Sequence, residues 1–311
     1  SREPAGLTVA LYFMGHLLEL HDQGDVEAAY VLRNRELWVI PFVNPDGYIL
    51  NQKSRNPVVR KNLRPTCGQQ LNSGVDINRN FADHFKPRLF PGCDEEHQGT
   101  HPFSEPETQA LKKVCDDNKF VAAFNFHSYG SMLTHPYNWA PTPKMSRLQK
   151  EDDNKIYEEL QKVFKFDKFG PAIKTVGYTA VGESDDWFYS AKGIISMSPE
   201  VGPESGKFFP PSRLIADIDS RNFVRTMHLV KKAGMELGAS WSHGGGGGAG
   251  PAGTRSTLEL ELRNSGLSTS SGRGLSLAIA GVGSAPAEEL EVSAFATVRE
   301  AGGKKLKAML A

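Results

Sequence analysis

The chain has 311 residues, of which 39% are hydrophobic, which is enough for one large globular domain and a smaller appendage. Lysine plus arginine and aspartate plus glutamate each number 36, so the formal net charge is zero. No basic face therefore indicates binding to nucleic acid or to an anionic membrane. The longest nearly apolar stretch, residues 7–18, is shorter than the roughly 20 residues that span a bilayer, so we expect no transmembrane segment.

Helical and strand patterns alternate along most of the chain. Apolar residues recur at helical spacing over 7–20, and the short apolar run 37–43 is typical of a buried parallel strand, closed by turn residues at 44–47. A capping box at Ser104 and Glu107 begins a helix that continues to about Cys115. The remaining predictions are, in order, a strand at 120–126, a helix at 155–164, a helix at 184–191, a strand at 194–197 and a long helix at 214–237.

This alternation predicts an α/β domain over residues 1–242. Residues 243–254 are rich in glycine and predict a flexible linker. Beyond it, the segments 257–262, 275–279 and 290–295 alternate polar and apolar residues with period two. We therefore expect a small β-rich module over residues 255–311.

Residues that could take part in catalysis or ligand binding lie in four separated segments. They are Asn44-Pro45-Asp46-Gly47-Tyr48, the run Val75-Asp76-Ile77-Asn78-Arg79-Asn80-Phe81, the run Phe126-His127-Ser128-Tyr129, and Glu200. Together they resemble the M14 zinc carboxypeptidases, over about residues 1–241. The resemblance implies a mixed, largely parallel central sheet flanked by helices, and one Zn²⁺ ion in the catalytic domain.

The metal ligands implied by the resemblance are Glu3 and His127. Spacing alone would not identify them, because a lone Glu is usually solvated and a lone His at a strand end is most often structural. In the family the Glu belongs to a His-x-x-Glu motif, and Ser1-Arg2-Glu3 resembles the part of it that follows the histidine. We therefore expect the third ligand to precede Ser1, and expect Asp76 to orient that imidazole through its far nitrogen.

Two residues are implied to act on the scissile bond. Glu200, at the end of a predicted strand, matches the general base that deprotonates water and then protonates the leaving amine. The family usually has an aromatic or aliphatic residue before this Glu, whereas this chain has Pro199. Arg60 matches the arginine that stabilises the developing oxyanion. Its loop is strongly basic, so Arg55 and Arg64 are alternatives for this role.

Four further residues are implied to contact the substrate, and three of them to bind its free carboxylate. Asn78 and Arg79 match the family's carboxylate receptor, where the planar guanidinium suits two parallel hydrogen bonds. Tyr178 matches a mobile tyrosine that closes over the bound C-terminal residue; alternatively, it is an aromatic residue that only packs in its loop. Arg2 is a further substrate contact by resemblance. An endopeptidase cleaves within a chain and would not need residues that bind a free C-terminal carboxylate.

Specificity is implied to depend on Asp185 within Ser184-Asp185-Asp186-Trp187. B-type members carry an aspartate at this position, and a carboxylate there favours a C-terminal Lys or Arg. The competing interpretation is a residue near a helix N-terminus that is stabilised by the helix dipole. The expected partners are thus the C-termini of peptides or proteins, and we expect a monomer.

The chain has three cysteines. Cys67 and Cys93 lie in loops on either side of the Asn78-Arg79 segment, where secreted family members carry a disulfide. Cys115 lies in a predicted helix, where a buried free thiol is expected. These features favour a secreted or secretory setting.

Two other functions stay open at this point. The first is an amidohydrolase of the same fold that acts on small acyl-amino acids or side-chain-linked residues. The second is a protein that binds peptides without turnover, because the chain as written lacks the first histidine of the zinc motif.

Overall fold

A computed structural model describes residues 2–54, 58–68, 73–87, 89–142, 145, 148, 151–234, 237–244, 257–264, 266–267 and 304–309. The chain forms two compact units, residues 1–230 and 231–311. In the described part of the chain, no helix combines the length and the apolar character that crossing a bilayer requires.

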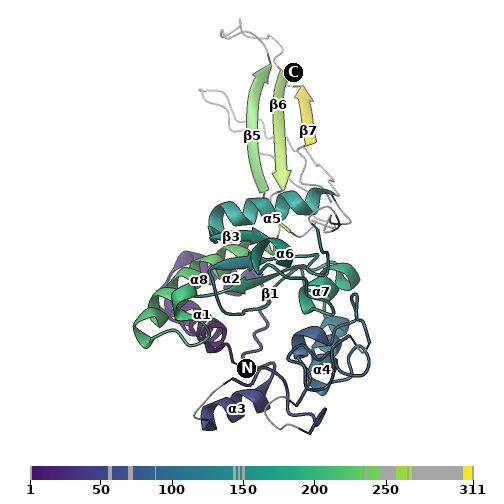
Figure 1. The fold of residues 1–311 in the computed structure, drawn as a ribbon. Helices are drawn as coiled ribbons and strands as arrows, with labels where there is room; N and C mark the ends of the chain where they lie inside the picture. Colours follow the sequence, from purple (N-terminus) through teal and green to yellow (C-terminus); the bar gives the residue numbers. More distant parts are fainter. Residues whose placement is uncertain are drawn as a thin grey trace, which may run out of the picture. The chain divides into compact units, whose positions relative to one another are not determined.

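The first unit is built on a four-stranded sheet with the order β1-β4-β2-β3 (Figure 1). Its strands are β1 (Ala122–Phe124), β2 (Met132–Thr134), β3 (Lys168–Gly170) and β4 (Ile195–Glu200). Strand β1 is parallel to β4 and β2 is parallel to β3, whereas β2 and β4 run antiparallel. The sheet is therefore mixed and largely parallel, as expected.

Helices flank this sheet. They are α1 (Pro4–Asp22), α2 (Val26–Asn34), α3 (Pro45–Lys53), α4 (Pro106–Asp117), α5 (Glu151–Phe164), α6 (Ala172–Thr175), α7 (Ser184–Lys192) and α8 (Ser212–Lys232), with short 3-10 turns at Ile77–Arg79 and Glu204–Gly206. One apolar cluster joins α1, α2 and α8, and a second joins α4 and α7 to the start of β4. Figure 1 shows α1, α2 and α8 gathered together, away from α4 and α7.

Local sequence explains where several helices begin and end. Pro4 opens α1 directly after Glu3, which occupies the N-cap position. The side chain of Asn44 accepts a hydrogen bond from the Gly47 amide and so caps α3. Helix α7 ends at Gly193, whose φ of 67° is left-handed and favours glycine.

Most of the predicted elements are confirmed. Helices α1, α4, α5 and α7 and strands β1 and β4 lie where the sequence predicted them. The turn predicted at 44–47 is instead the beginning of α3, because Asn, Pro, Asp and Gly suit a helix start as well as a turn. The helix predicted over 214–237 ends at Lys232.

The strand predicted at 37–43 is wrong. This segment belongs to no strand of the described chain, and the side chains of Trp38, Ile40 and Phe42 are 50%, 43% and 41% exposed. Leu37 packs against the cluster of α1, α2 and α8, and Trp38 contacts Phe120 edge to face. The apolar run thus packs by a few side chains and lacks the paired backbone of a strand.

The second unit contains an antiparallel sheet with the order β5-β6-β7. Its strands are β5 (Leu237–Gly244), β6 (Thr257–Asn264) and β7 (Lys304–Met309). Strand β6 confirms the prediction at 257–262. The predicted linker overlaps β5 at His243 and Gly244, because composition alone does not reveal strand pairing. The strands predicted at 275–279 and 290–295 lie outside the described residues.

Candidate metal and substrate site

The carboxyl ends of two parallel strands bring His127 and Glu200 together. Strand β4 ends at Glu200, and an isolated parallel bridge pairs Glu200 with His127, just beyond the end of β1. The His127 amide donates to the Pro199 carbonyl at 2.9 Å, and the Val201 amide donates to the His127 carbonyl at 2.9 Å. Open α/β sheets bind their ligands at this edge.

The start of α1 adds Glu3 to this edge. Glu3 Oε2 lies 2.8 Å from Nδ1 of His127 and accepts a hydrogen bond from the Ser128 amide at 3.2 Å. Gly6 allows the approach, because a Cβ on Gly6 would stand 3.0 Å from both the Cβ and the carbonyl oxygen of Phe126. The predicted ligands Glu3 and His127 are thus neighbours.

A cation and a second carboxylate complete this cluster. The Arg60 guanidinium donates through Nη1 to Glu3 Oε1 at 2.9 Å and through Nε to Asp76 Oδ2 at 2.8 Å. Asp76 Oδ1 also accepts from the Asn78 amide at 3.1 Å. Arg60 therefore bridges the two acids, while Arg64, one of the alternatives for its role, pairs with Glu105 instead. Arg55 lies outside the described residues.

The donor pair fits two positions of a zinc site. A carboxylate oxygen and an imidazole nitrogen are ordinary zinc ligands at about 2.0–2.2 Å, so two of them on one ion lie roughly 3 Å apart. Glu3 Oε2 and His127 Nδ1 match this separation at 2.8 Å. No group of three His, Cys, Asp or Glu residues able to hold a metal occurs among the residues that the structure describes. The described residues thus supply two donors, Glu3 and His127, to such a site.

The charges of the cluster shift its acids in opposite directions. Burial would raise the pKa of Glu3, but the charge and hydrogen bond of His127 and the charge of Arg60 hold that pKa well below its usual range. Burial raises the pKa of Glu200 to about 7, with the charges of Glu3 and Glu183 adding to the rise and those of His127 and Arg60 opposing it. Two carboxylates of one site thus differ in proton affinity, as an ion ligand and a general base require.

Asn78 connects this cluster to the first turn of α7. Its Nδ2 lies 3.2 Å from His127 Nε2, and its Oδ1 accepts from the amide and the hydroxyl of Ser184 at 3.0 and 2.7 Å. Asp185 follows in the same turn and is 0% exposed. Its Oδ1 accepts from Asn125 and its Oδ2 from the Ser198 hydroxyl at 2.7 Å. Burial, followed by the charge of Glu183, raises the pKa of Asp185 to about 8.

The two predicted substrate arginines are paired with neighbouring acids. Arg79 is 4% exposed and donates through Nε and Nη2 to Glu96 Oε1, at 3.3 and 2.7 Å. Arg2 pairs with Glu95, and its guanidinium lies 4.5 Å from the ring centroid of Phe208. A substrate carboxylate would therefore compete with Glu96 for the planar fork of Arg79.

Tyr178 is 51% exposed and precedes α7. Burial of its hydroxyl raises its pKa, with Glu200 and Glu183 adding to the rise and Arg79 and Arg60 opposing it. The hydroxyl is thus within electrostatic reach of the cluster, although more than half of the residue is exposed. This position suits a side chain that can move over a bound ligand.

A model described as zinc carboxypeptidase matches residues 1–225 of this chain. The chain belongs to the zinc carboxypeptidase family. Its sequence is similar to carboxypeptidase B2 of Rattus norvegicus, at 28% identity over 226 residues that make up 69% of this chain and 52% of the relative. Carboxypeptidase B2 of Homo sapiens is 30% identical over 200 residues, which make up 61% of this chain and 46% of that protein.

The fold is also similar to that of a solved structure. The structure of bovine thrombin-activatable fibrinolysis inhibitor in complex with tick carboxypeptidase inhibitor matches with a TM-score of 0.62 and 25% identity, covering 74% of this chain and 78% of that one. The chain spans about half the length of the curated relatives it matches.

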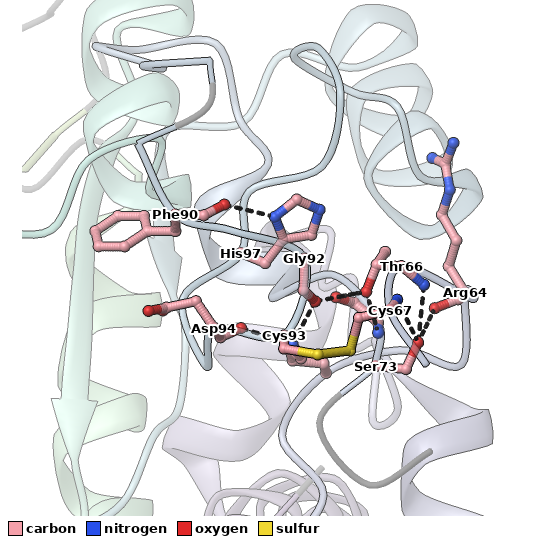
Figure 2. The surroundings of a disulfide bond; sticks show 11 residues. Arg64, Thr66, Cys67, Ser73, Phe90, Gly92, Cys93, Asp94 and His97 are labelled. Carbon is pink, nitrogen blue, oxygen red and sulfur yellow. Dashed lines mark hydrogen bonds between the residues drawn. A yellow bond between two sulfur atoms is a disulfide. The ribbon is translucent and has the colours of Figure 1, made fainter. Parts of the chain in front are cut away.

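A disulfide bond joins two loops near the candidate site. Cys67 and Cys93 are bonded, with their Cα atoms 5.5 Å apart, which confirms the predicted pair. Figure 2 shows the Thr66 hydroxyl donating to the Gly92 carbonyl next to this bond, at 2.7 Å. Cys115 is free and buried, as predicted.

Three acids near the site, Glu183, Glu95 and Glu96, were not predicted from the sequence. Glu183 precedes the Ser184-Asp185 pair and is 5% exposed, and a charged residue so deeply buried is uncommon without a partner. Its place next to a predicted specificity residue was the only available signal. Nothing in the sequence distinguished Glu95 and Glu96 from solvated acids, since only the fold brings them to Arg2 and Arg79.

Proposed function

We propose that this chain carries the catalytic domain of a metallocarboxypeptidase that removes the C-terminal residue of peptides or proteins, with a preference for Lys or Arg. The observation that carries the proposal is the meeting of Glu3, His127 and Glu200 at one edge of the sheet. A metal-binding pair beside a carboxylate of raised pKa is the arrangement of a hydrolytic site.

Zinc would be held by Glu3 and His127, together with the third ligand that the family resemblance assigns to a histidine before Ser1. When bound, a zinc ion supplies Lewis acidity that polarises a carbonyl and lowers the pKa of water toward about 7. The Arg60 guanidinium neutralises part of the charge on Glu3, and the Ser128 amide fixes the carboxylate in place.

Glu200 acts as the general base. Its pKa of about 7 lets it accept a proton from the attacking water near neutral pH and return it to the leaving amine. Because Glu200 and His127 are bridged through the backbone, the base keeps a fixed distance from the metal-binding edge. Arg60, on the other side of Glu3, is placed to stabilise the oxyanion that forms on the scissile carbonyl.

Recognition of the C-terminal residue follows from the surrounding side chains. Arg79 and Asn78 receive the terminal carboxylate, with the Arg79 fork partly released from Glu96, and Tyr178 moves over the bound residue. Asp185 supplies negative charge for a basic side chain. The similarity to proteins named carboxypeptidase B2 supports the preference for Lys or Arg.

The metal site is tested with two chains, one extended by a single His before Ser1 and the other by a single Ala. After exposure to Zn²⁺ and gel filtration, elemental analysis should give about one zinc per chain with the added His and much less with the added Ala. His127→Asn should lose the ion in both. Equal zinc in both extended chains would contradict the predicted third ligand, and retention in His127→Asn would contradict His127.

The reaction is tested on peptides that end in Arg, Phe or Glu, with the His-extended chain. Release of Arg should be fastest, and Glu200→Gln should slow it by about 100-fold or more. Turnover of N-acyl amino acids without release from peptides would instead support the amidohydrolase. Tight binding of peptides without any turnover would support the non-catalytic alternative.

We also propose a cellular location and an oligomeric state for the protein. The Cys67–Cys93 disulfide is typical of an oxidising compartment, which supports a secreted or secretory location. We propose that the protein acts as a monomer, and sedimentation in non-reducing buffer tests this.

A further inference from the structure

Lys61 is a buried lysine whose ammonium group the proposed reaction does not use. The residue is 4% exposed and directly follows Arg60 in the chain. Lysine is almost never buried so deeply unless its charge is paired or hydrogen-bonded, because desolvation of an ammonium group is costly. The partners of Lys61 therefore indicate what this side chain does in the fold.

The Lys61 ammonium group binds two backbone carbonyls, one on either side of Cys93. Its Nζ donates to the Asp94 carbonyl at 2.6 Å and to the Gly92 carbonyl at 3.3 Å. Hydrogen bonds from a charged donor are stronger than those from a neutral one. Lys61 therefore holds the loop that contains Cys93 from the inside of the protein.

The backbone at Lys61 is itself fixed. Asn44, which caps α3, donates through Nδ2 to the carbonyls of Arg60 and Lys61, at 3.2 and 2.9 Å. Gly74 packs against the same residue, because a Cβ on Gly74 would stand 3.0 Å from the Cβ of Lys61. The side chain thus extends from a fixed backbone position to the loop that it holds.

The Asp94 carbonyl begins a tight turn that carries two acids. The His97 amide donates to this carbonyl at 3.2 Å, which closes a four-residue turn with Glu95 and Glu96 in its central positions. The Asp94 side chain also accepts from the Glu96 amide, at 2.8 Å. The Lys61 ammonium group therefore holds this turn at its first residue.

The turn at 94–97 presents its acids to the two arginines of the candidate site. Glu96 Oε1 lies 2.7 Å from Nη2 of Arg79, and Glu95 pairs with Arg2. The Glu96 side chain is 33% exposed, so water competes for its carboxylate and the pairing is weak on its own. The position of the turn therefore decides how often Glu96 occupies Arg79.

We propose that Lys61 is a positioning residue that fixes the turn at 94–97 and thereby sets how strongly Glu96 competes with a substrate carboxylate for Arg79. Lys61 touches no substrate in this arrangement and acts through the Asp94 carbonyl. This inference rests on the proposed function, in which Arg79 receives the terminal carboxylate.

Arg79 keeps a second anchor that does not depend on the turn. Its Nη1 donates to the Asn78 carbonyl at 2.9 Å. When the turn loosens, the guanidinium should therefore stay in place while Glu96 leaves it more often. Loss of the Lys61 ammonium group should then strengthen the binding of a peptide with a free C-terminus.

A lysine that only stabilises the fold would give a different result. Its removal would weaken peptide binding or leave it unchanged, and the effect would be the same for a peptide acid and a peptide amide. Removal of a lysine that holds a competing acid in place should favour the peptide acid alone, because the amide has no carboxylate for Arg79 to bind.

The first experiment measures the turn itself by hydrogen exchange. Lys61→Met keeps most of the side-chain volume but removes the ammonium group. We expect the amides of residues 94–97 to exchange about 10-fold faster than in the wild type. Lys162→Met, which changes an exposed lysine of α5, is the matched control and should leave this exchange unchanged. Unchanged exchange in Lys61→Met would overturn the inference.

The second experiment measures binding of Gly-Gly-Arg and of its C-terminal amide by calorimetry, in buffer with EDTA so that turnover does not interfere. Lys61→Met should bind the acid about 3-fold more tightly than the wild type does and the amide no more tightly. In a chain that already carries Glu96→Gln the competing acid is absent, so the further change Lys61→Met should alter affinity for the acid by less than about 1.5-fold. Lys162→Met should bind both peptides as the wild type does.

Asp94→Ala loosens the same turn from a partly exposed position, so it keeps the inference testable if Lys61→Met does not fold. This change removes the side chain that accepts from the Glu96 amide. It should also raise exchange at residues 94–97 and tighten binding of the acid, provided that Glu96 is present. Faster exchange without tighter binding would overturn the inference.

Two further outcomes would overturn it. One is an equal gain in affinity for the acid and the amide in Lys61→Met. The other is a gain that persists undiminished in the chain with Glu96→Gln, which would show that Lys61 acts by another route. If Glu96→Gln tightens binding of the acid but Lys61→Met does not, the inference alone fails. If neither change affects binding of the acid, the proposed role of Arg79 fails with it.

Discussion

Nδ1 of His127 lies 2.8 Å from Oε2 of Glu3, although the two residues are 124 positions apart in the sequence. One residue follows a strand of the sheet and the other precedes the first helix. Their meeting depends on how closely α1 approaches the end of β1. Gly6 sets this approach, because its Cα faces the backbone of Phe126.

Substitution of Gly6 tests this contact. Alanine in a helix is usually more stable than glycine by about 1 kcal/mol, but at position 6 its Cβ would stand 3.0 Å from the Phe126 carbonyl oxygen. We expect Gly6→Ala to lower the free energy of unfolding by about 1 kcal/mol, measured with denaturant. Gly15→Ala is the matched control, since nothing lies within 4 Å of its Cβ position and it should stabilise the same helix. Equal stabilisation by both would contradict the contact.

Removal of the Glu96 carboxylate should free Arg79 for substrate. Glu96 is the acid that occupies the Arg79 fork, at 2.7 Å from Nη2. We expect Glu96→Gln to tighten binding of peptides with a free C-terminus by about 3- to 10-fold, because the side chain of Glu96 is 33% exposed and its pairing is screened by solvent.

The matched control for this experiment is Glu158→Gln, which removes an exposed carboxylate of α5 and should leave peptide binding unchanged. Calorimetric titrations should compare each peptide with its C-terminal amide. If affinity rises equally for the peptide acid and the peptide amide, Arg79 does not bind the terminal carboxylate.

Protonation of His135 should destabilise the fold in mild acid. Burial lowers the pKa of His135 to about 4, with the charge of Lys174 adding to the effect and a hydrogen bond to the Pro136 carbonyl opposing it. The unfolded chain binds this proton at about pH 6.5. Between these values the unfolded state binds more protons, so stability falls as the pH drops from 6.5 toward 4.

This group should contribute about 2 kcal/mol of stability at pH 7 that is lost at pH 5. His135→Phe can still stack on Tyr157, whose ring centroid lies 4.4 Å from that of His135, and should remove that part of the pH dependence. Denaturant unfolding at both pH values measures it. The exposed His21→Gln should retain the wild-type difference, and an unchanged difference in His135→Phe would refute the assignment.

Loss of the disulfide should destabilise the first unit. Cys67 and Cys93 are 26 positions apart, and closing a loop of this length stabilises a fold by about 3 kcal/mol. We expect the double variant Cys67→Ser, Cys93→Ser to unfold at correspondingly lower denaturant concentration. Reduction of the wild type should reproduce the effect, and Cys115→Ala should respond to reductant as the wild type does.

The site was easier to predict from the sequence than some of the fold. Glu3, His127 and Glu200 were assigned by resemblance, and the structure places them together because parallel strands end at the same edge. The strand at 37–43 failed because an apolar run shows that a segment packs against something, but does not show whether its backbone has a partner. Strands β2 and β3 have three residues each, too few to show any period.

Partners on other segments were the main omission at the site. Sequence motifs identified Arg2 and Arg79, but the acids that hold them lie on a loop whose position depends on the fold. Glu183 was missed for a related reason, since its deep burial is a property of the folded chain.

The cross-link between Cys67 and Cys93 has a consequence for both arginines. Cys93 comes immediately before the short stretch that contains Glu95 and Glu96, so the sulfur bridge anchors the acids that orient Arg2 and Arg79. Arg2 and Arg79 lie far apart in the sequence, yet the acids that pair with them are both fixed by this one disulfide bond. Reduction of this disulfide should therefore alter both of the proposed contacts between these arginines and a peptide C-terminus at the same time.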